Sequence, residues 1–505
     1  MRPPHVLLRL VGALVERRLA RVHRHAARVQ RRLWRRILTR YRGTELGRRL
    51  QLARFASPET YAAGLPVTAP ADYRELWDRA RAENPAGLVH PRRLRFMAGS
   101  SGTVDAARFI PVPDELLAAY RRFTNDAMFH AFQLLGDHSL LDGNVLITAA
   151  APVMERTASG ITIGGSSGLA TLEASRLARQ VFRPTPEILA LTDWQEKIDR
   201  TVEQAFDLDV RALTGIPICV VPLLERLLAE AERRGRPAAS AADVWPNLRL
   251  YLFSGSPLAL HGDRLRQLLG DRPVTYEVYS STEAPFAFQH RAGSPDLLLG
   301  LETCYFELQP AASDVDHPRL PIHEARVGQT YRLLPTTPGG LFAYRIGDLV
   351  EITGIEPYLV RFAGREREEV KVGTGCISAA DVTATVAAAA GETGALVGQF
   401  FVCPSAEGAN TLEWHVELLR APADAAAFAS ALDRGLSDRN RHVAYARRDG
   451  ALLTDPRVIE LPAGTIDAYV RGRKQFGQAK FLHIYGSREV PDQVLALARE
   501  RQARD

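Results

Sequence analysis

Two apolar runs that end in small polar residues decide the expected fold. Leu248–Phe253 (LRLYLF) leads into Ser254–Pro257 (SGSP), and Val274–Tyr279 (VTYEVY) leads into Ser280–Glu283 (SSTE). Short apolar runs bounded by turn residues are typical of buried strands. At the end of the second run, an aromatic ring, hydroxyl groups and one carboxylate suit a nucleotide and its magnesium ion. At the end of the first, a flat base could approach bare backbone. For both segments a purely structural turn is the alternative.

The sequence around these runs repeats the same pattern. Strand-like apolar runs at Val145–Ala149 and Ile216–Val221 alternate with longer helical stretches at Ile188–Phe206 and Val221–Arg233. This alternation predicts an α/β fold in which helices pack on sheets. From Gly364 onward the chain is charged and carries further strand and helix signals. We therefore expect a large domain over residues 43–364 and a smaller domain over residues 365–505.

The composition is that of an ordinary globular protein. The chain has 505 residues, 46% hydrophobic and 24% charged, which excludes disordered, collagen-like and coiled-coil classes. The net charge of +6 arises in one segment, because residues 1–50 hold 15 arginines against Glu16 and Glu45. The other residues carry 49 basic and 56 acidic side chains. The body is therefore mildly acidic, and we expect no nucleic-acid partner for it.

Residues 1–42 form the basic segment. Apolar side chains recur at helical spacing on one face, at Val22, Ala26, Val29, Leu33, Ile37 and Tyr41, and arginines fill the opposite face. We expect a basic amphipathic helix that lies across the body, with weak contact to an anionic membrane surface as the alternative. The apolar run Val6–Val15 is too short to span a bilayer and lacks a small-residue cleavage site, so neither a transmembrane helix nor a signal peptide is predicted.

The cysteines indicate a reducing compartment. They lie far apart, at Cys219, Cys304, Cys376 and Cys403, with no CxxC pair and no histidine cluster. This spacing argues against a disulfide scaffold and against a cysteine-rich zinc site. A cytoplasmic location is expected.

Two further motifs could bind parts of a nucleotide. Gly99–Thr103 (GSSGT) follows the basic run Arg92–Met97, and successive backbone N–H groups with hydroxyls can surround phosphate oxygens. Tyr344–Val350 (YRIGDLV) holds Asp348 in a turn, where its carboxylate could bind two ribose hydroxyls. A plain loop is the alternative for the first motif, and a simple β-turn for the second.

The C-terminal part adds a charged segment and scarce lysines. Gly364–Val372 is either a solvated linker or a hinge. Only four of the 64 basic residues are lysines: Lys197, Lys371, Lys474 and Lys480. Lys480 follows Gln478-Ala479 and suits phosphate as a compact, mobile cation. Lys197 lies in the charge-alternating stretch Asp193–Arg200 and is predicted to be on the surface.

Taken in order, these motifs resemble those of the adenylate-forming ligases, and most of all the acyl-acid amido synthetases of the Gretchen Hagen Three (auxin-responsive) family. Thr44–Gly47 (TELG), Leu65–Thr68 (LPVT) and Cys304–Glu307 (CYFE) agree with that branch. The resemblance spans residues 30–485. It implies a large N-terminal domain of sheets sandwiched by helices, followed by a smaller, mobile α+β C-terminal domain.

The resemblance implies a role for each matching residue. Ser100, Ser101 and Thr103 would contact the phosphates of ATP, with Arg108 in place of the family's lysine. Ser254 and Gly255 resemble the adenine-side loop. Tyr279 would lie near adenine within the motif that continues through Ser280, Ser281 and Thr282, and Glu283 would hold Mg²⁺. Asp348 resembles the ribose-binding aspartate, Arg365 the hinge arginine, and Lys480 the lysine that enters the site from the C-terminal domain.

The implied activity is ATP-dependent activation of a small carboxylic acid as acyl-adenylate, then transfer to an amine such as an amino acid. Two departures bear on it. Val104–Arg108 (VDAAR) replaces the usual end of the phosphate loop, and Asp105 would repel phosphate if it faced the ligand. Thr374–Cys376 departs where acceptor contacts are expected. An acid–thiol (acyl-CoA) ligase, and a nucleotide- or ligand-binding protein of the same fold without turnover, remain the alternatives.

Overall fold

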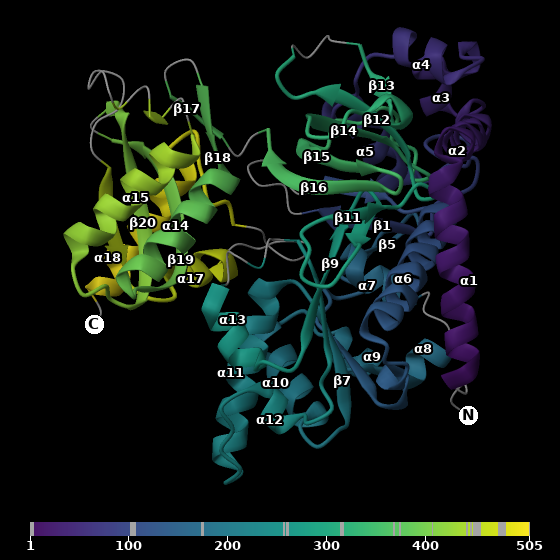
Figure 1. The fold of residues 1–505 in the computed structure, drawn as a ribbon. Helices are drawn as coiled ribbons and strands as arrows, with labels where there is room; N and C mark the ends of the chain where they lie inside the picture. The colour runs from purple at the N-terminus through teal and green to yellow at the C-terminus, as the bar shows by residue number, and fades with distance from the viewer. Residues whose placement is uncertain are drawn as a thin grey trace. The chain divides into compact units, whose positions relative to one another are not determined.

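The structure is a computed structural model. It describes residues 5–100, 108–172, 176–255, 258, 262–313, 318–366, 369–372, 375–406, 408–440, 443–444, 447, 456–472 and 481–503. The chain divides into two compact units, a larger one with most of residues 1–362 and a smaller one with most of residues 363–505 (Figure 1). The predicted α/β class, with sheets covered by helices and a smaller α+β unit, is confirmed.

One long sheet is the framework of the larger unit. Among the described residues it has twelve strands. In spatial order they are β13 (Leu320–Pro321), β12 (Tyr305–Pro310), β14 (Thr330–Thr336), β15 (Asp348–Ile355), β16 (Tyr358–Arg365), β11 (Leu297–Leu299), β10 (Pro285–Gln289), β9 (Val274–Ser280), β8 (Leu250–Ser254), β7 (Val210–Gly215), β3 (Asn144–Ile147) and β6 (Phe182–Arg183). A second sheet has the order β2 (Arg108–Pro111), β1 (Phe96–Ser100), β5 (Thr162–Gly164) and β4 (Glu155–Arg156).

Strand pairing in the long sheet changes from parallel to antiparallel at β9. Strands β6, β3, β7, β8 and β9 pair in parallel, whereas β9 pairs antiparallel with β10. Parallel strands need crossover connections, which here are mostly helices, and antiparallel strands can follow one another directly. The carboxyl end of β9 therefore lies at the border between the two halves of the sheet.

Helices α1 (His5–Arg24) and α2 (Ala26–Tyr41) form the N-terminal part of the larger unit. The other helices of residues 1–255 are α3 (Glu45–Arg49), α4 (Pro58–Gly64), α5 (Arg74–Glu83), α6 (Asp114–Leu135), α7 (Ser166–Leu172), α8 (Arg176–Val181), α9 (Pro186–Leu189), α10 (Trp194–Ala205), α11 (Pro217–Arg233) and α12 (Ala241–Val244). Helix α13 (Gly262–Leu269) lies between β8 and β9 in the chain. None of the helices in the described ranges is long and apolar enough to cross a membrane.

The strands expected at Val145–Ala149, Leu248–Phe253 and Val274–Tyr279 are confirmed as β3, β8 and β9. The strand expected at Ile216–Val221 is wrong. Ile216 precedes a helix, because α11 begins at Pro217, while the strand β7 comes just before it. Proline is well suited to the first position of a helix, since its missing N–H would have no helical partner there. The long helical stretch expected at 188–206 is also divided, because Asp193 accepts a hydrogen bond from the Glu196 N–H and so starts α10 afresh.

The buried side-chain amide of Gln30 joins helix α2 to the larger unit by hydrogen bonds. The predicted apolar face is buried except for the half-buried Val29, although a break at His25 separates Val22 in α1 from the rest. Gln30, only 1% exposed, donates from Nε2 to the carbonyls of Leu301 (2.7 Å) and Cys304 (2.8 Å) and accepts from the Phe306 N–H (2.7 Å). These bonds satisfy backbone groups just before and inside β12, which would be costly to bury unpaired.

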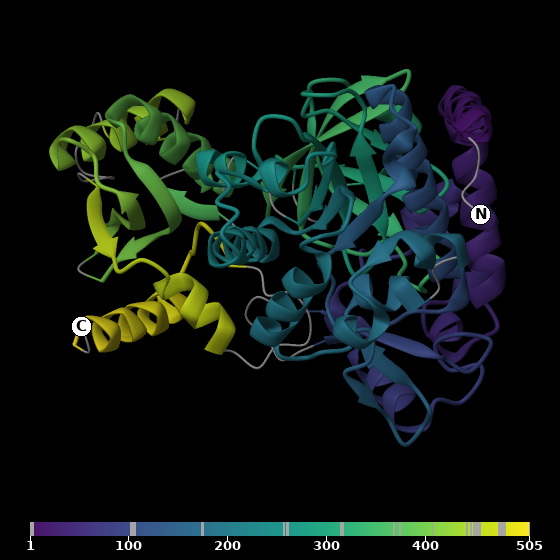
Figure 2. The same ribbon diagram turned by 90° about the horizontal axis from the view of Figure 1, so that it is seen from below.

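The smaller unit is a sheet with helices on both faces (Figure 2). Its strands are β19 (Leu396–Ser405), β20 (Gly408–Arg420) and β21 (Arg457–Leu461), with a separate β17–β18 hairpin (Glu369–Val372 and Gly375–Ser378). Helices α14 (Ala379–Thr393) and α15 (Ala425–Arg439) cover the face that carries Phe400 and Val402. Helices α17 (Thr465–Gly472) and α18 (Glu489–Gln502) cover the face that carries Phe401 and Cys403.

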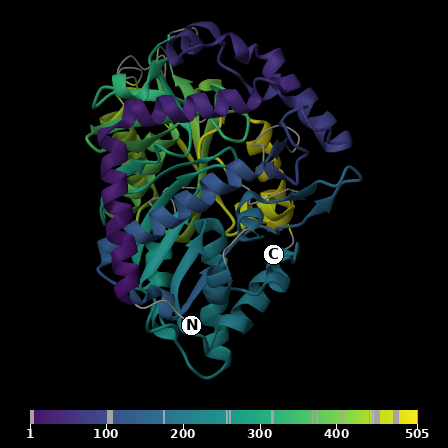
Figure 3. The ribbon, with the colours of Figure 1, turned by 90° about the vertical axis from the view of Figure 1, so that its right-hand side faces the viewer.

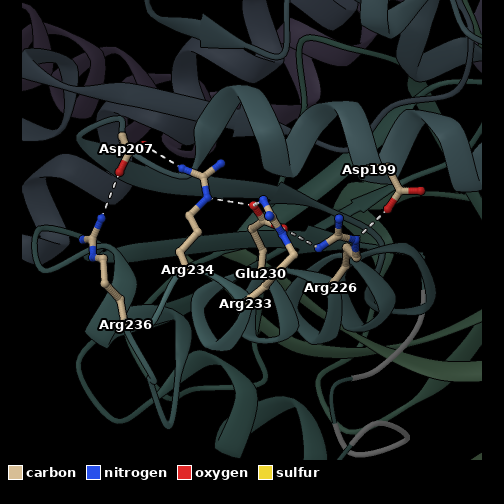
Figure 4. Close-up of polar contacts among 7 residues, drawn as sticks. All are labelled: Asp199, Asp207, Arg226, Glu230, Arg233, Arg234 and Arg236. Carbon is tan, nitrogen blue, oxygen red and sulfur yellow. Dashed lines mark hydrogen bonds and ion pairs between the residues drawn. The ribbon is translucent and has the colours of Figure 1, made fainter.

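An ion network lies on α11 (Figure 4). The Glu230 carboxylate, with a 3% exposed side chain, accepts from Arg226 (3.1 Å), Arg233 (2.5 Å) and Arg234 (2.7 Å). Arg226 also pairs with Asp199 of α10 at 2.6 Å, so the network connects the two helices. The hydrogen bonds from Arg233 and Arg234 hold the pKa of Glu230 well below its usual value of 4.5.

Replacing Glu230 with glutamine should lower the melting temperature of the protein at neutral pH by a few degrees. Because the folded-state pKa of Glu230 is depressed, its stabilising contribution is complete above about pH 4.5 and is lost as the pH falls further. Thermal denaturation followed by circular dichroism from neutral to acid pH measures this. Glu232→Gln, at an exposed position of the same helix, is the matched control. A Glu230→Gln protein as stable as wild type at pH 7 would contradict the prediction.

Candidate functional site

The carboxyl ends of β8 and β9 bring two of the predicted motifs together. The strands are parallel neighbours in which Ser254 is paired with Val278, so the residues that follow each strand emerge at the same edge. Ser254 is half-buried, and Gly255 is exposed with φ = +90°, a conformation that favours glycine. Ligands of open α/β sheets bind at this edge of the strands.

Tyr279 and Asp348 are joined directly. The Tyr279 hydroxyl donates to Asp348 Oδ2 at 2.6 Å, which links two motifs 69 residues apart in sequence. Asp348, 2% exposed, begins β15 after Gly347, whose φ of +85° makes the turn. The Tyr279 ring packs on Phe286 and Phe362, with centroids 5.0 and 5.7 Å away. These contacts fix the phenol, and with it the position of the carboxylate.

The turn after β9 has its own hydrogen bonds. The Glu283 N–H donates to Ser281 Oγ at 3.2 Å, and the Ser281 N–H donates to the carbonyl of Ala284 at 3.0 Å. Tyr120 of α6 donates its hydroxyl proton to the Ser281 carbonyl. Ser280, Ser281, Thr282 and Glu283 are all half-buried, so their side chains are partly open to solvent. The half-buried carboxylate beside hydroxyl groups is an oxygen donor set that fits Mg²⁺.

Tyr120 is a residue that sequence reasoning missed. Burial, and after it the negative charge of Glu283, raise the pKa of Tyr120 well above its usual value. The tyrosine is therefore protonated and serves as a hydrogen-bond donor that holds the turn. No local sequence signal marks it, because its role depends on α6 packing beside a loop about 160 residues later.

Several predicted residues lie at or beyond the limits of the described chain. Ser101, Thr103 and Lys480 lie outside the described residues. For Ser100 and Arg108 the structure describes the backbone, in which the two residues are paired between β1 and β2, on either side of the segment predicted to bind phosphate. Arg365 is half-buried and ends β16, directly after Gly364 with φ = +120°.

A different cluster in the smaller unit could be mistaken for a metal centre. Cys403, Glu413 and His415 are buried, and within the described ranges they are the group whose ligand atoms lie close enough to hold an ion, all within 4.8 Å of one another. The Arg488 guanidinium already contacts this group, at 2.7 Å from Glu413 Oε2 and 3.8 Å from Cys403 Sγ. A cation therefore already neutralises the carboxylate, and an ion network explains the cluster better than a metal does.

The sequence pattern predicted Lys197 on the surface, and this prediction is wrong because the residue is buried. Its side chain is 5% exposed, and its Nζ donates to the Ala149 carbonyl at 3.3 Å, just beyond the carboxyl end of β3. Burial lowers the pKa of Lys197 to about 8. Lys197 lies on the inward face of α10, which also carries the buried residues Ile198, Thr201 and Val202. The scarcity of lysine was the one sequence signal that could have marked it.

Comparison with known families gives a consistent match. A model of the GH3 family N-terminal domain matches residues 15–202, and a model of the GH3 family central domain matches residues 297–365, together about half of the chain. Probable indole-3-acetic acid-amido synthetase GH3.12 of Oryza sativa subsp. japonica is 25% identical over 421 residues, which are 66% of this chain and 68% of that protein. Indole-3-acetic acid-amido synthetase GH3.10 of Arabidopsis thaliana is 30% identical over 129 residues, 22% of either chain.

Solved structures agree on the fold. AtGH3.15 acyl acid amido synthetase in complex with 2,4-DB aligns with a TM-score of 0.78 over 97% of this chain and 96% of its own, at 15% identity. 2-Hydroxyisobutyryl-CoA ligase in complex with 2-HIB-AMP aligns with a TM-score of 0.54 over 95% and 91%, at 19% identity. With its two matched domains and this shared architecture, the chain belongs to the GH3 family and has the adenylate-forming ligase fold.

Proposed function

We propose that the protein activates a small carboxylic acid with ATP as an acyl-adenylate and transfers the acyl group to an amine, such as an amino acid, to form an amide. The observation that carries this proposal is the Tyr279–Asp348 hydrogen bond at the carboxyl ends of β8 and β9, because it assembles a nucleotide-binding edge from separate motifs. Membership of the GH3 family supports the choice of an acid and an amine, since its relatives are named acid-amido synthetases.

In the first step an oxygen of the substrate carboxylate attacks the α-phosphorus of ATP. The bond from the α-phosphorus to its bridging oxygen breaks, and pyrophosphate leaves with the negative charge. Catalysis of this kind depends on positioning and on charge stabilisation. Ser254 and Gly255 contact the adenine side, Tyr279 orients Asp348, and Asp348 accepts hydrogen bonds from the ribose hydroxyls.

The remaining matched residues act on the phosphates. Ser100, Ser101, Thr103 and Arg108 bind them from the loop that the β1–β2 hairpin supports, and Lys480 enters from the smaller unit. Glu283 would hold Mg²⁺, which would neutralise charge on the phosphate oxygens. Ser280, Ser281 and Thr282 line the same turn. The backbone that carries Glu283 is held by the hydrogen bonds of the turn and by Tyr120.

In the second step the amine nitrogen attacks the acyl carbonyl carbon, AMP leaves, and the nitrogen loses a proton. Arg365 is the proposed hinge residue of this step, and closure of the site keeps water from the adenylate. The wide spacing of the four cysteines, Cys219, Cys304, Cys376 and Cys403, supports a reducing, cytoplasmic setting for this reaction.

Lys197 contributes to binding the acid substrate. It is a buried cation near the carboxyl ends of β3 and β7, the edge at which ligands of such sheets bind. Among the described residues it contacts the Ala149 carbonyl and the ring of Trp194, and Cys219 is the nearby group whose charge favours the protonated amine. A substrate carboxylate would supply a full negative charge.

A panel of small carboxylic acids assayed for ATP-dependent pyrophosphate release should reveal one or more substrates. Mass spectrometry of the product with a mixture of amino acids should then show an amide. Offering coenzyme A instead distinguishes an acid–thiol ligase, whose product would be a thioester. Lys480→Ala serves as a control, because loss of the phosphate-binding cation should slow the first step strongly. ATP binding without pyrophosphate release for any acid would favour a binding protein of the same fold.

Tyr279→Phe should raise the KM for ATP about tenfold or more, because a hydrogen bond to a charged group contributes roughly 1.5–3 kcal/mol. The substitution keeps the ring packing and removes only the donor to Asp348. Steady-state pyrophosphate release measures the change. Tyr276→Phe is the matched control, since this buried hydroxyl on the same strand has no hydrogen-bond partner within the described residues. An unchanged KM in Tyr279→Phe would remove the proposed positioning role.

Lys197→Met should raise the KM for the acid about tenfold or more, the usual effect of removing one partner of a buried charge pair. Its melting temperature at pH 7 should not fall, because the change removes a buried cation and keeps the side chain's length. Since the folded-state pKa is lowered to about 8 from 10.5, wild type should gain stability relative to the variant as the pH rises from 8 to 10.5. A lower melting temperature with an unchanged KM would show a structural role instead.

A further inference from the structure

Helix α1 exposes an apolar stripe on its outer face. Val6, Leu7, Leu10 and Leu14 are 68%, 49%, 59% and 63% exposed. They are half of the strongly exposed large hydrophobic side chains found in the described ranges, and all lie within nine residues. Spacings of three and four place them on one side of the helix. Such a concentration of exposed apolar surface marks an interaction site.

The inner face of α1 is already fully engaged. Leu8 and Leu19 are buried in a cluster with Phe123 and Ala127 of α6. Glu16 Oε1 lies 2.6 Å from His130 Nδ1, and Arg18 pairs with Asp126 and Glu302. The helix therefore has a fixed orientation in the larger unit, and the apolar stripe cannot turn inward.

Arginines continue the outer face toward α2. Arg17, Arg21 and Arg24 follow the stripe on the same side of α1, and Arg28, Arg32 and Arg35 lie exposed on α2. None of these six forms an ion pair with another residue in the part of the chain that the structure describes. Both helices face the viewer in Figure 3 and meet at His25.

The α2 arginines also line a depression. Arg32, Arg35, Arg36 and Arg40 surround it together with Thr39 and Pro91. Burial, and then repulsion from Arg122, Arg32 and Arg40, lower the pKa of Arg36. An anion in this depression would relieve that repulsion.

We propose that the outer face of α1 and α2 docks the protein on an anionic membrane surface. The stripe Val6, Leu7, Leu10 and Leu14 enters the boundary between headgroups and acyl chains, and the arginines that follow it bind lipid phosphates and carboxylates. Amphipathic helices of this kind lie in the plane of the interface, and neither apolar burial nor charge alone gives stable binding. None of the residues of this face is among those assigned to the nucleotide-binding edge, so the two roles use different side chains.

An anionic membrane would be complementary to both the apolar stripe and the arginines of this face. A nucleic acid or a second copy of the chain would be complementary to only one of the two. A nucleic acid would use the arginines and leave the apolar stripe exposed. A second copy of the chain could cover the stripe, but it would bring two sets of arginines together, and Glu16, the one acidic residue of segment 5–41, is already paired with His130. Charge complementarity therefore favours anionic lipid.

The test is co-sedimentation of the full chain with phosphatidylcholine vesicles, with and without phosphatidylserine. Wild type should bind the phosphatidylserine vesicles, and added salt should weaken the binding. Leu10→Ser with Leu14→Ser should reduce partitioning about tenfold or more, and each of Arg17→Gln, Arg21→Gln and Arg24→Gln about fivefold. Val327→Ser with Ile355→Ser is the matched control, because these exposed residues of the larger unit lie elsewhere.

Pyrophosphate release by each variant reports that its fold is intact. The proposal is overturned if phosphatidylserine makes no difference, or if the leucine variant binds vesicles as wild type does. It is also overturned if light scattering shows a wild-type dimer that the leucine variant converts to monomer, because a second copy then covers the stripe. Arginine-dependent binding to duplex DNA or RNA that the leucine variant retains would assign the face to nucleic acid.

Discussion

The candidate site depends on the two different pairings of β9. This strand runs parallel to β8 and antiparallel to β10, so it belongs to both halves of the long sheet. On the parallel side its carboxyl end lies beside that of β8, which brings Ser254 and Gly255 to the same edge as Tyr279. On the antiparallel side the chain must reverse at once, and the turn that reverses it carries Glu283. A fully parallel sheet would send the chain into a long crossover at this point.

A second constraint is the way long-range hydrogen bonds fix the turns and loops at the ends of strands. Tyr279 holds Asp348 from 69 residues away, and Tyr120 holds the Ser281 carbonyl from α6. Gln30 does the same for the residues before β12. Buried polar groups must find partners, so each bond fixes one loop in a single arrangement. The N-terminal helices are therefore part of the larger unit's framework, and their outer face remains available for another partner.

The sequence predicted the architecture better than the surroundings of single residues. Three apolar runs became strands because β-branched and aromatic residues bounded by turns leave few other solutions. The run at Ile216–Val221 failed because an apolar segment does not reveal whether it is a strand or a buried helix, and Pro217 decided for the helix. Lys197 was misplaced because charges alternate along α10, whereas the helix has one inward face and Lys197 lies on it. Roles assigned to Ser101, Thr103 and Lys480 rest on the resemblance alone.

By itself the sequence determined the fold class, the order of the motifs proposed to bind the nucleotide and the basic character of residues 1–42. These properties follow from local composition and spacing, which can be observed residue by residue. Only the tertiary structure decided that Asp348 is held by Tyr279, that Tyr120 supports the Glu283 turn, and that Lys197 is buried while Leu10 and Leu14 are exposed. Contacts between residues distant in sequence, and the face that a helix turns to its neighbours, depend on packing of the whole chain. Packing is the property that no local pattern records.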